Sequence, residues 1–261
     1  MINNYTKISK ELKNKGYSVI ENFIPKKKCD LYNNVISKII SKQNLIENTS
    51  GFHNTGSSMA YNIQNKNKIF FELIFHKEIL KICELYFSYG AHTKDKYNFQ
   101  FDNIAGRRLI GKCKNQELHI DSRLCGAEPP ISIHFFLYLT DVKEGSGPTR
   151  LVPKSHIIKR YPKKSDNKKT IKILGKKGKL LICNSSIWHG SSKKTNFEDR
   201  TIITLSFNRW FFRQKFAAPY SLSQSIKKKM TLKQKFIYGI YNYPPKSEKM
   251  RLRMRGNLPK N

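Results

Sequence analysis

Long apolar runs are missing from this sequence. The first twenty residues, MINNYTKISKELKNKGYSVI, contain neither the continuous apolar segment nor the small-residue cleavage site of a secretory signal. The longest apolar runs elsewhere, such as IFFELIF and FFLYL, are far shorter than the roughly 20 residues that a membrane-spanning helix needs. We therefore expect a soluble, cytoplasmic protein without a membrane span.

Closely spaced cysteines are missing too. The chain has five cysteines, which are widely separated and never arranged as Cys-x-x-Cys: Cys29, Cys83, Cys113, Cys125 and Cys183. An odd number without close pairs argues against a disulfide framework and against a zinc ribbon. We expect reduced thiols, most of them buried.

Acidic residues are scarce. The 261 residues include 18 Asp and Glu against 50 Lys and Arg, which gives a formal charge of +32. Such a surplus can indicate a nucleic-acid partner. However, the basic residues are 39 Lys and only 11 Arg, accompanied by 22 Asn, and proteins that read nucleic acids rely on Arg for bidentate contacts. We attribute most of the charge to composition and keep a nucleic-acid partner as an alternative.

Apolar residues are present in the amount that a packed core needs. They make up 38% of the chain and include 16 Phe and 13 Tyr, more than disordered chains carry. Helical spacing predicts helices over 5–15, ended by Gly16, over 26–42, and one or two more over 68–87, with a loop at 45–57.

The pattern changes to short β-prone segments from about residue 97. Seven follow one another, separated by Gly- and Pro-containing turns: YNFQF, ELHI, ISIHFFLYL, TRLV, IKIL, KLLIC and TIITLSF. We predict an α+β fold in one domain over 1–261, with helical support mainly in 1–90, a β core at about 95–215 and a basic C-terminal helix and tail in 216–261. The middle of a basic stretch, 154–179, is predicted to be a solvated loop.

Two of the seven histidines have informative neighbours. His119 and Asp121 are two residues apart, so on a strand both side chains point to one face. A surface His beside a surface Asp is the plain alternative. His189 follows the apolar segment KLLIC, where the chain leaves the core. Two imidazoles and one carboxylate form the facial triad of non-haem Fe(II) oxygenases.

Arg200 opens the apolar segment TIITLSF, eleven positions after His189. An arginine that faces inward from a core strand is costly unless an anion pairs with it. A dicarboxylate that binds a metal through one end supplies this anion, and its other carboxylate matches the guanidinium fork. The alternative is a surface pair with Glu198 or Asp199.

These motifs occur in the order found in a known family. The sequence resembles the phytanoyl-CoA dioxygenase-like branch of the Fe(II)/2-oxoglutarate oxygenases over about residues 10–215. The resemblance rests on LKNKGYSVIENFIP, LHID, FFLYLTDVKEGSGPTRLVPKSH and GKLLICNSSIWHGSSKKTNFEDR. It implies a double-stranded β-helix, the cupin-like jelly roll, as the β core. Lys154 stands where the family usually has a glycine, and His156 matches a residue that shapes a loop and binds no metal.

The resemblance also implies roles for single residues. It places Fe(II) on His119, Asp121 and His189, and the distal carboxylate of 2-oxoglutarate on Arg200. Two further polar residues are expected to contact the co-substrate: Gln100 and Ser191. Three residues are candidates for the substrate pocket, although His134 can face either side of its strand: Phe136, His134 and Cys125.

The activity implied is that of a dioxygenase that uses Fe(II), 2-oxoglutarate and O₂ to hydroxylate a C–H bond of a small molecule, with release of succinate and CO₂. Asp121 favours hydroxylation because related halogenases have a small residue at that position. The basic composition mildly favours an anionic substrate. The alternatives are an oxygenase directed at nucleic acid and a catalytically inactive jelly-roll binding protein, against which the full set of four residues argues.

Overall fold

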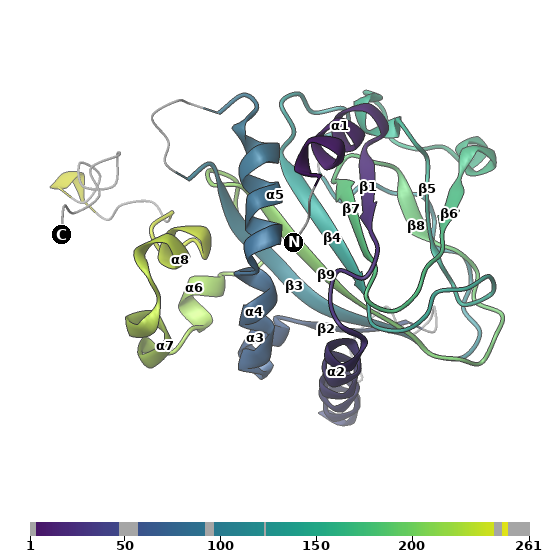
Figure 1. Ribbon diagram of the computed structural model, residues 1–261, viewed down its shortest axis with the longest axis horizontal. Helices are drawn as coiled ribbons and strands as arrows, with labels where there is room; N and C mark the ends of the chain where they lie inside the picture. Colours follow the sequence, from purple (N-terminus) through teal and green to yellow (C-terminus); the bar gives the residue numbers. More distant parts are fainter. Residues whose placement is uncertain (1–3, 47–56, 92–96, 123, 243–246, 250–261) are drawn as a thin grey trace.

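The computed structural model describes residues 4–46, 57–91, 97–122, 124–242 and 247–249, and within them helices precede and follow a block of strands (Figure 1). The helices are α1 (Tyr5–Lys15), α2 (Lys26–Ile46), α3 (Ile63–Lys66), α4 (Phe71–Ile74), α5 (Lys77–Ser88), α6 (Ala218–Ser221), α7 (Gln224–Lys229) and α8 (Leu232–Ile237). Short 3₁₀ helices occur at η2 (Lys68–Phe70), η3 (Ser155–Ile157) and η4 (Lys164–Lys169).

The strands form two antiparallel sheets. They are β1 (Tyr17–Ile20), β2 (Ser57–Tyr61), β3 (Phe99–Leu109), β4 (Ser132–Tyr138), β5 (Thr149–Leu151), β6 (Ile171–Ile173), β7 (Leu180–Asn184), β8 (His189–Ser191) and β9 (Arg200–Arg209). The six-stranded sheet has the order β1-β7-β4-β9-β3-β2, and the three-stranded sheet has the order β6-β5-β8. In Figure 1 the smaller sheet lies on the right of the molecule, and α6, α7 and α8 lie on the left.

Strand β4 separates two apolar cores. Its residues Ile133, Phe135 and Leu137 pack in the larger core together with the N-terminal helices. The alternate residues Phe136 and Tyr138 pack in a smaller core with apolar residues of the three-stranded sheet. Since successive side chains of a strand point to opposite faces, the second face of β4 borders the space between the two sheets. We call it the inner face.

Local signals explain the first helix. The Asn4 side chain caps α1 by accepting a hydrogen bond from the Lys7 amide, and Gly16 ends the helix with φ +82°. A Cβ at Gly16 would lie 2.5 Å from Nδ1 of His156, so no larger residue fits without a shift. The predicted bounds of this helix are confirmed, and His156 packs beneath the turn.

Lys154, which replaces the usual glycine, keeps a left-handed backbone with φ +65°. Its amide donates to the carbonyl of Lys15 at 2.9 Å, which fastens this turn to the end of α1. The turn therefore keeps the shape that a glycine would favour, in spite of the larger side chain.

Several strands differ from the predictions. The segment ELHI forms only an isolated bridge between His119 and His189, because the chain turns away at once toward Ser185. Strand β3 runs on to Leu109, and β2 and β8 were not predicted from sequence. Among the described residues, all five cysteines are free and no helix has the length and apolar character that crossing a membrane requires.

Candidate metal centre and adjoining cavities

Backbone pairing brings His119, Asp121 and His189 together. The amide of each histidine donates to the carbonyl of the other, both at 3.0 Å, and the Asp121 amide donates to the carbonyl of Ser185 at 3.0 Å. One candidate ligand atom from each of the three side chains lies within 4.8 Å of the other two. The chain thus places the three predicted ligands around one point.

Both imidazoles present the same nitrogen to this point. Nδ1 of His119 lies 3.0 Å from the carbonyl oxygen of Glu117, and Nδ1 of His189 lies 3.1 Å from that of Ile187. A carbonyl only accepts hydrogen bonds, so Nδ1 carries the proton and Nε2 has a free lone pair. The Nε2 atoms of His119 and His189 lie 3.9 and 3.4 Å from the Asp121 carboxylate. This donor set, N, N and O, fits Fe(II).

The charges of the group agree with metal binding. Burial lowers the pKa of His119 to about 4. Burial alone would raise the pKa of Asp121, but the imidazoles of His134 and His189 outweigh it and hold this pKa well below its usual value. At neutral pH, His119 is therefore an uncharged donor beside a charged carboxylate.

The structure shows which side His134 faces. It lies on the inner face of β4, and its Nδ1 is 2.8 Å from Oδ2 of Asp121. Phe136, two residues on, faces the same side, with its ring centroid 5.7 Å from that of His189. Both candidates border the group of three. Cys125 is half-buried and lines neither the cavity at Ser191, nor the cleft at Asp121, nor the cavity between α1, β1 and α5.

Arg200 is a buried cation with unpaired N–H groups. Its side chain is 1% exposed. One terminal nitrogen donates to Oγ1 of Thr149 at 2.9 Å, whereas Nε and the other terminal nitrogen have no partner among the described residues. Burial lowers its pKa to about 10, which leaves it charged at neutral pH. A buried guanidinium with open donors favours an anionic ligand.

Ser191 lies close to Arg200, because Thr149 is a neighbour of both residues. It pairs with Thr149 across β8 and β5, and it lines a cavity of about 80 Å³. Arg107 lines the same cavity and donates to Oγ of Ser57 at 3.0 Å and to Oε1 of Gln116 at 3.1 Å. Sequence reasoning missed Arg107 because β3 was predicted to end before it. The sequence signal that could have revealed Arg107 is its position as a charged residue within a longer strand.

The structure does not bring Gln100 to this group. Gln100 pairs with Asn208, whereas Arg200 pairs with Leu109 at the other end of the β3–β9 ladder. Eight strand residues span roughly 26 Å, far more than the length of a five-carbon dicarboxylate. The Gln100 amide donates to the carbonyl of Phe212 and accepts a hydrogen bond from Asn242 at 2.8 Å. Its role there is to hold the C-terminal segment.

A cleft of about 630 Å³ opens beside Asp121, one of the three predicted ligands. Asp121, His134 and Ser132 line it together with Asn208 and residues 212–215. We call it the main cleft. Its volume is in the range of cavities that hold small organic ligands, so it is the natural place for a substrate.

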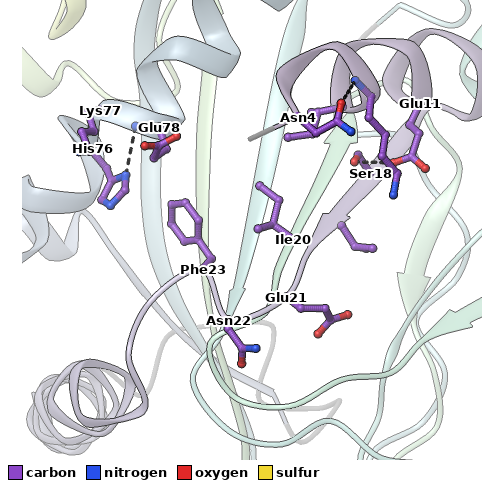
Figure 2. Close-up of a pocket in the computed structure, with 13 residues that line it drawn as sticks. Asn4, Glu11, Ser18, Ile20, Glu21, Asn22, Phe23, His76, Lys77 and Glu78 are labelled. Carbon is purple, nitrogen blue, oxygen red and sulfur yellow. Dashed lines mark hydrogen bonds between the residues drawn. The ribbon is translucent and has the colours of Figure 1, made fainter. Parts of the chain in front are cut away.

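A second large cavity, of about 530 Å³, lies between α1, β1 and the start of α5 (Figure 2). Glu11 accepts a hydrogen bond from Ser18 at 2.7 Å there, and the His76 side chain caps α5 by accepting from the Glu78 amide. None of its lining residues belongs to the group of His119, Asp121 and His189.

Comparisons with known proteins agree with this geometry. The model of the phytanoyl-CoA dioxygenase family matches residues 12–202. Dioxygenase FUM3 of Gibberella moniliformis is 24% identical over 206 residues, which are 75% of this chain and 67% of that protein.

Solved structures give the same fold at low sequence identity. The chain is similar to the non-heme alpha ketoglutarate dependent epimerase SnoN from nogalamycin biosynthesis, with a TM-score of 0.62 and 11% identity over 79% of this chain and 83% of that one. It is also similar to HygX from Streptomyces hygroscopicus with nickel and 2-oxoglutarate bound, with a TM-score of 0.61 and 12% identity over 80% and 88% of the two chains. The predicted α+β jelly-roll class is confirmed.

Proposed function

The chain belongs to the phytanoyl-CoA dioxygenase family of Fe(II)- and 2-oxoglutarate-dependent dioxygenases, and from this premise we propose that it hydroxylates a C–H bond of a small molecule with release of succinate and CO₂. The observation that carries the proposal is the convergence of His119, Asp121 and His189 beside the main cleft. The buried, partly unpaired guanidinium of Arg200 supports a dicarboxylate co-substrate.

In this proposal His119, Asp121 and His189 hold the iron, and Arg200 binds the distal carboxylate of 2-oxoglutarate. When bound, iron and 2-oxoglutarate supply the oxidising chemistry together with O₂. The three protein ligands contribute a single negative charge, so a dianionic co-substrate is still accepted. The Phe136 ring packs beside His189 and would shield that side of the iron from water.

Hydroxylation is proposed over other outcomes of the same chemistry. SnoN is described as an epimerase, so the fold also serves reactions that add no oxygen. The Asp121 carboxylate fills the position that related halogenases keep small, which supports transfer of hydroxyl. A substrate that gains the mass of one oxygen atom would agree with the proposal, whereas a product of unchanged mass would indicate epimerisation.

The iron assignment is tested by anaerobic titration of Fe(II) and 2-oxoglutarate into the apo-protein, followed through the visible metal-to-ligand charge-transfer band of the chelate. We expect the band with the wild type and its loss in His119→Ala and His189→Ala. His76→Ala is the matched control, because it removes a half-buried imidazole from the other large cavity. No band with the wild type, or an undiminished band in both variants, would contradict the assignment.

A further inference from the structure

The main cleft also carries information on the substrate. We propose that the substrate is an amphipathic organic anion whose carboxylate, phosphate or sulfonate binds Arg213, with an N–H or O–H donor against Asn208 and an apolar body between them and the iron centre. This inference rests on the proposed function, because it assumes that the main cleft is the substrate site.

The cleft has a direction set by strand pairing. His134, which contacts Asp121, pairs with Ser206, and Ser132 pairs with Asn208. Two residues along a strand span roughly 7 Å, so Ser132 and Asn208 lie one such step away from the group that would hold the iron. The face of β9 that carries Ser206 and Asn208 therefore leads from the group that would hold the iron toward the end of the strand.

The segment 211–217, which we call the strap, closes the far end of the cleft. It follows β9, and residues 212–215 line the cleft. The Lys215 amide donates to Oδ1 of Asp102 at 2.8 Å, and the Gln214 side chain donates to the carbonyls of Tyr238, at 3.1 Å, and Phe101. The strap is thus held against β3 and the end of α8 and presents its side chains at a defined place.

Among the described residues that line this cleft, charge pairing leaves Arg213 available to a ligand. Asp102 accepts hydrogen bonds from Oγ of Ser206 at 2.9 Å and from the Lys215 amide, and Nζ of Lys215 lies 3.7 Å from it. Asp121 belongs to the proposed iron site. Arg213 is exposed and, among the described residues, has no hydrogen bond or ion pair. Its planar fork suits a carboxylate, phosphate or sulfonate.

A second, independent observation concerns Asn208. Its side chain is 5% exposed and lines the cleft, yet Oδ1 has no hydrogen-bond partner among the described residues. Buried polar atoms are normally paired, so this oxygen is suited to a ligand donor. Leu124, Ile131 and Phe212 line the same cleft, and Leu124 is 54% exposed. An apolar ligand body would cover these side chains.

The test compares two dyes that differ in charge. 8-Anilinonaphthalene-1-sulfonate has apolar rings, an N–H donor and a sulfonate, whereas N-phenyl-1-naphthylamine lacks only the sulfonate. Both are titrated by fluorescence into the protein loaded anaerobically with Fe(II) and 2-oxoglutarate. We expect Arg213→Ala to weaken binding of the anionic dye by about fivefold and to leave the neutral dye unchanged, with Arg213→Lys intermediate.

Control variants locate the dyes. Phe212→Ala should weaken both dyes, because it removes apolar surface of the cleft, and Arg108→Ala should weaken neither, because Arg108 pairs with Asp199 outside the cleft. Failure of the anionic dye to bind, or an equal response of the two dyes to Arg213→Ala, would overturn the inference. The charge-transfer band separates this outcome from failure of the proposed function, since it reports the iron site alone and should be unchanged in Arg213→Ala.

Discussion

The buried charge of a single residue, Arg200, is more informative about the function of this site than the net charge of the protein is. Among 50 basic residues, Arg200 is fully buried and keeps unpaired N–H groups. These open N–H groups are stabilised when an anion accepts their hydrogen bonds, because no side chain among the described residues does so. At this scale the relevant measurements are affinities for the co-substrate and for the metal.

Arg200→Ala is expected to weaken 2-oxoglutarate binding by about 2–5 kcal/mol, the range for removing one partner of a desolvated charge pair. The measurement is the anaerobic titration of 2-oxoglutarate at saturating Fe(II). Arg108→Ala is the matched control, because Arg108 is half-buried, pairs with Asp199 and points to the opposite face of the β3–β9 ladder from Arg200. An unchanged affinity in Arg200→Ala would assign the arginine another role.

His134→Phe is expected to weaken Fe(II) binding by about 10–100-fold. The substitution keeps an aromatic ring but removes the donor that lies 2.8 Å from the Asp121 carboxylate, so the carboxylate loses its fixed orientation. His134→Gln keeps a donor and should retain part of the affinity. Fe(II) is titrated at saturating 2-oxoglutarate, with thermal unfolding as the check on folding. Equal affinities of wild type and His134→Phe would show that this contact does not position the ligand.

At the scale of elements, the basic stretch 154–179 is more ordered than its composition suggests. Its middle is predicted to be a solvated loop, but it contains the 3₁₀ helices η3 and η4, and the predicted strand segment IKIL forms β6. Its one acidic residue, Asp166, is buried and accepts hydrogen bonds from the Arg160 guanidinium at 2.8 and 3.1 Å and from the Lys163 amide at 2.9 Å. The Asp166 carboxylate thus stabilises the fold of a segment whose other charged side chains are all basic.

Asp166→Asn is expected to lower the melting temperature at pH 7, by an amount that shrinks as the pH falls. The Arg160 guanidinium, together with the Lys163 amide, holds the pKa of Asp166 well below its usual value. The stabilisation is therefore complete above the unfolded-state pKa of about 3.9 and is lost as the pH falls through the lower folded-state pKa. Melting curves from pH 7 to pH 3 measure it. A difference between the two proteins that stays constant with pH would contradict this account.

At the scale of the whole molecule, the charge of +32 predicts non-specific attraction to polyanions. We expect duplex DNA of random sequence to bind weakly, with an affinity that falls at least about tenfold between roughly 50 and 200 mM salt, and to leave succinate formation unchanged. Fluorescence anisotropy of labelled DNA and a succinate assay measure both. Salt-resistant binding, or DNA-stimulated succinate formation, would favour the nucleic-acid alternative instead.

Local signals predicted some elements well and others poorly. The helix over 5–15 was predictable because Gly16 ends it and its apolar spacing is regular. The side that His134 faces was not, because every residue of β4 is buried and no alternation of polar and apolar residues marks the two faces. Gln100 could not be placed relative to Arg200 without the register of β3 against β9, which depends on residues distant in sequence.

The amino-acid sequence alone was enough to nominate the candidate iron ligands and the arginine, because His-x-Asp, the distal histidine and Arg200 occur in an order that resembles the family's and supply the donor types that Fe(II) binds. The contacts of His134, Arg107, Asn208 and Arg213 came only from the tertiary structure. These residues act on partners across strands or on the strap, and antiparallel pairing sets such distances through register. Register is a property of the folded sheets, and no local segment encodes it.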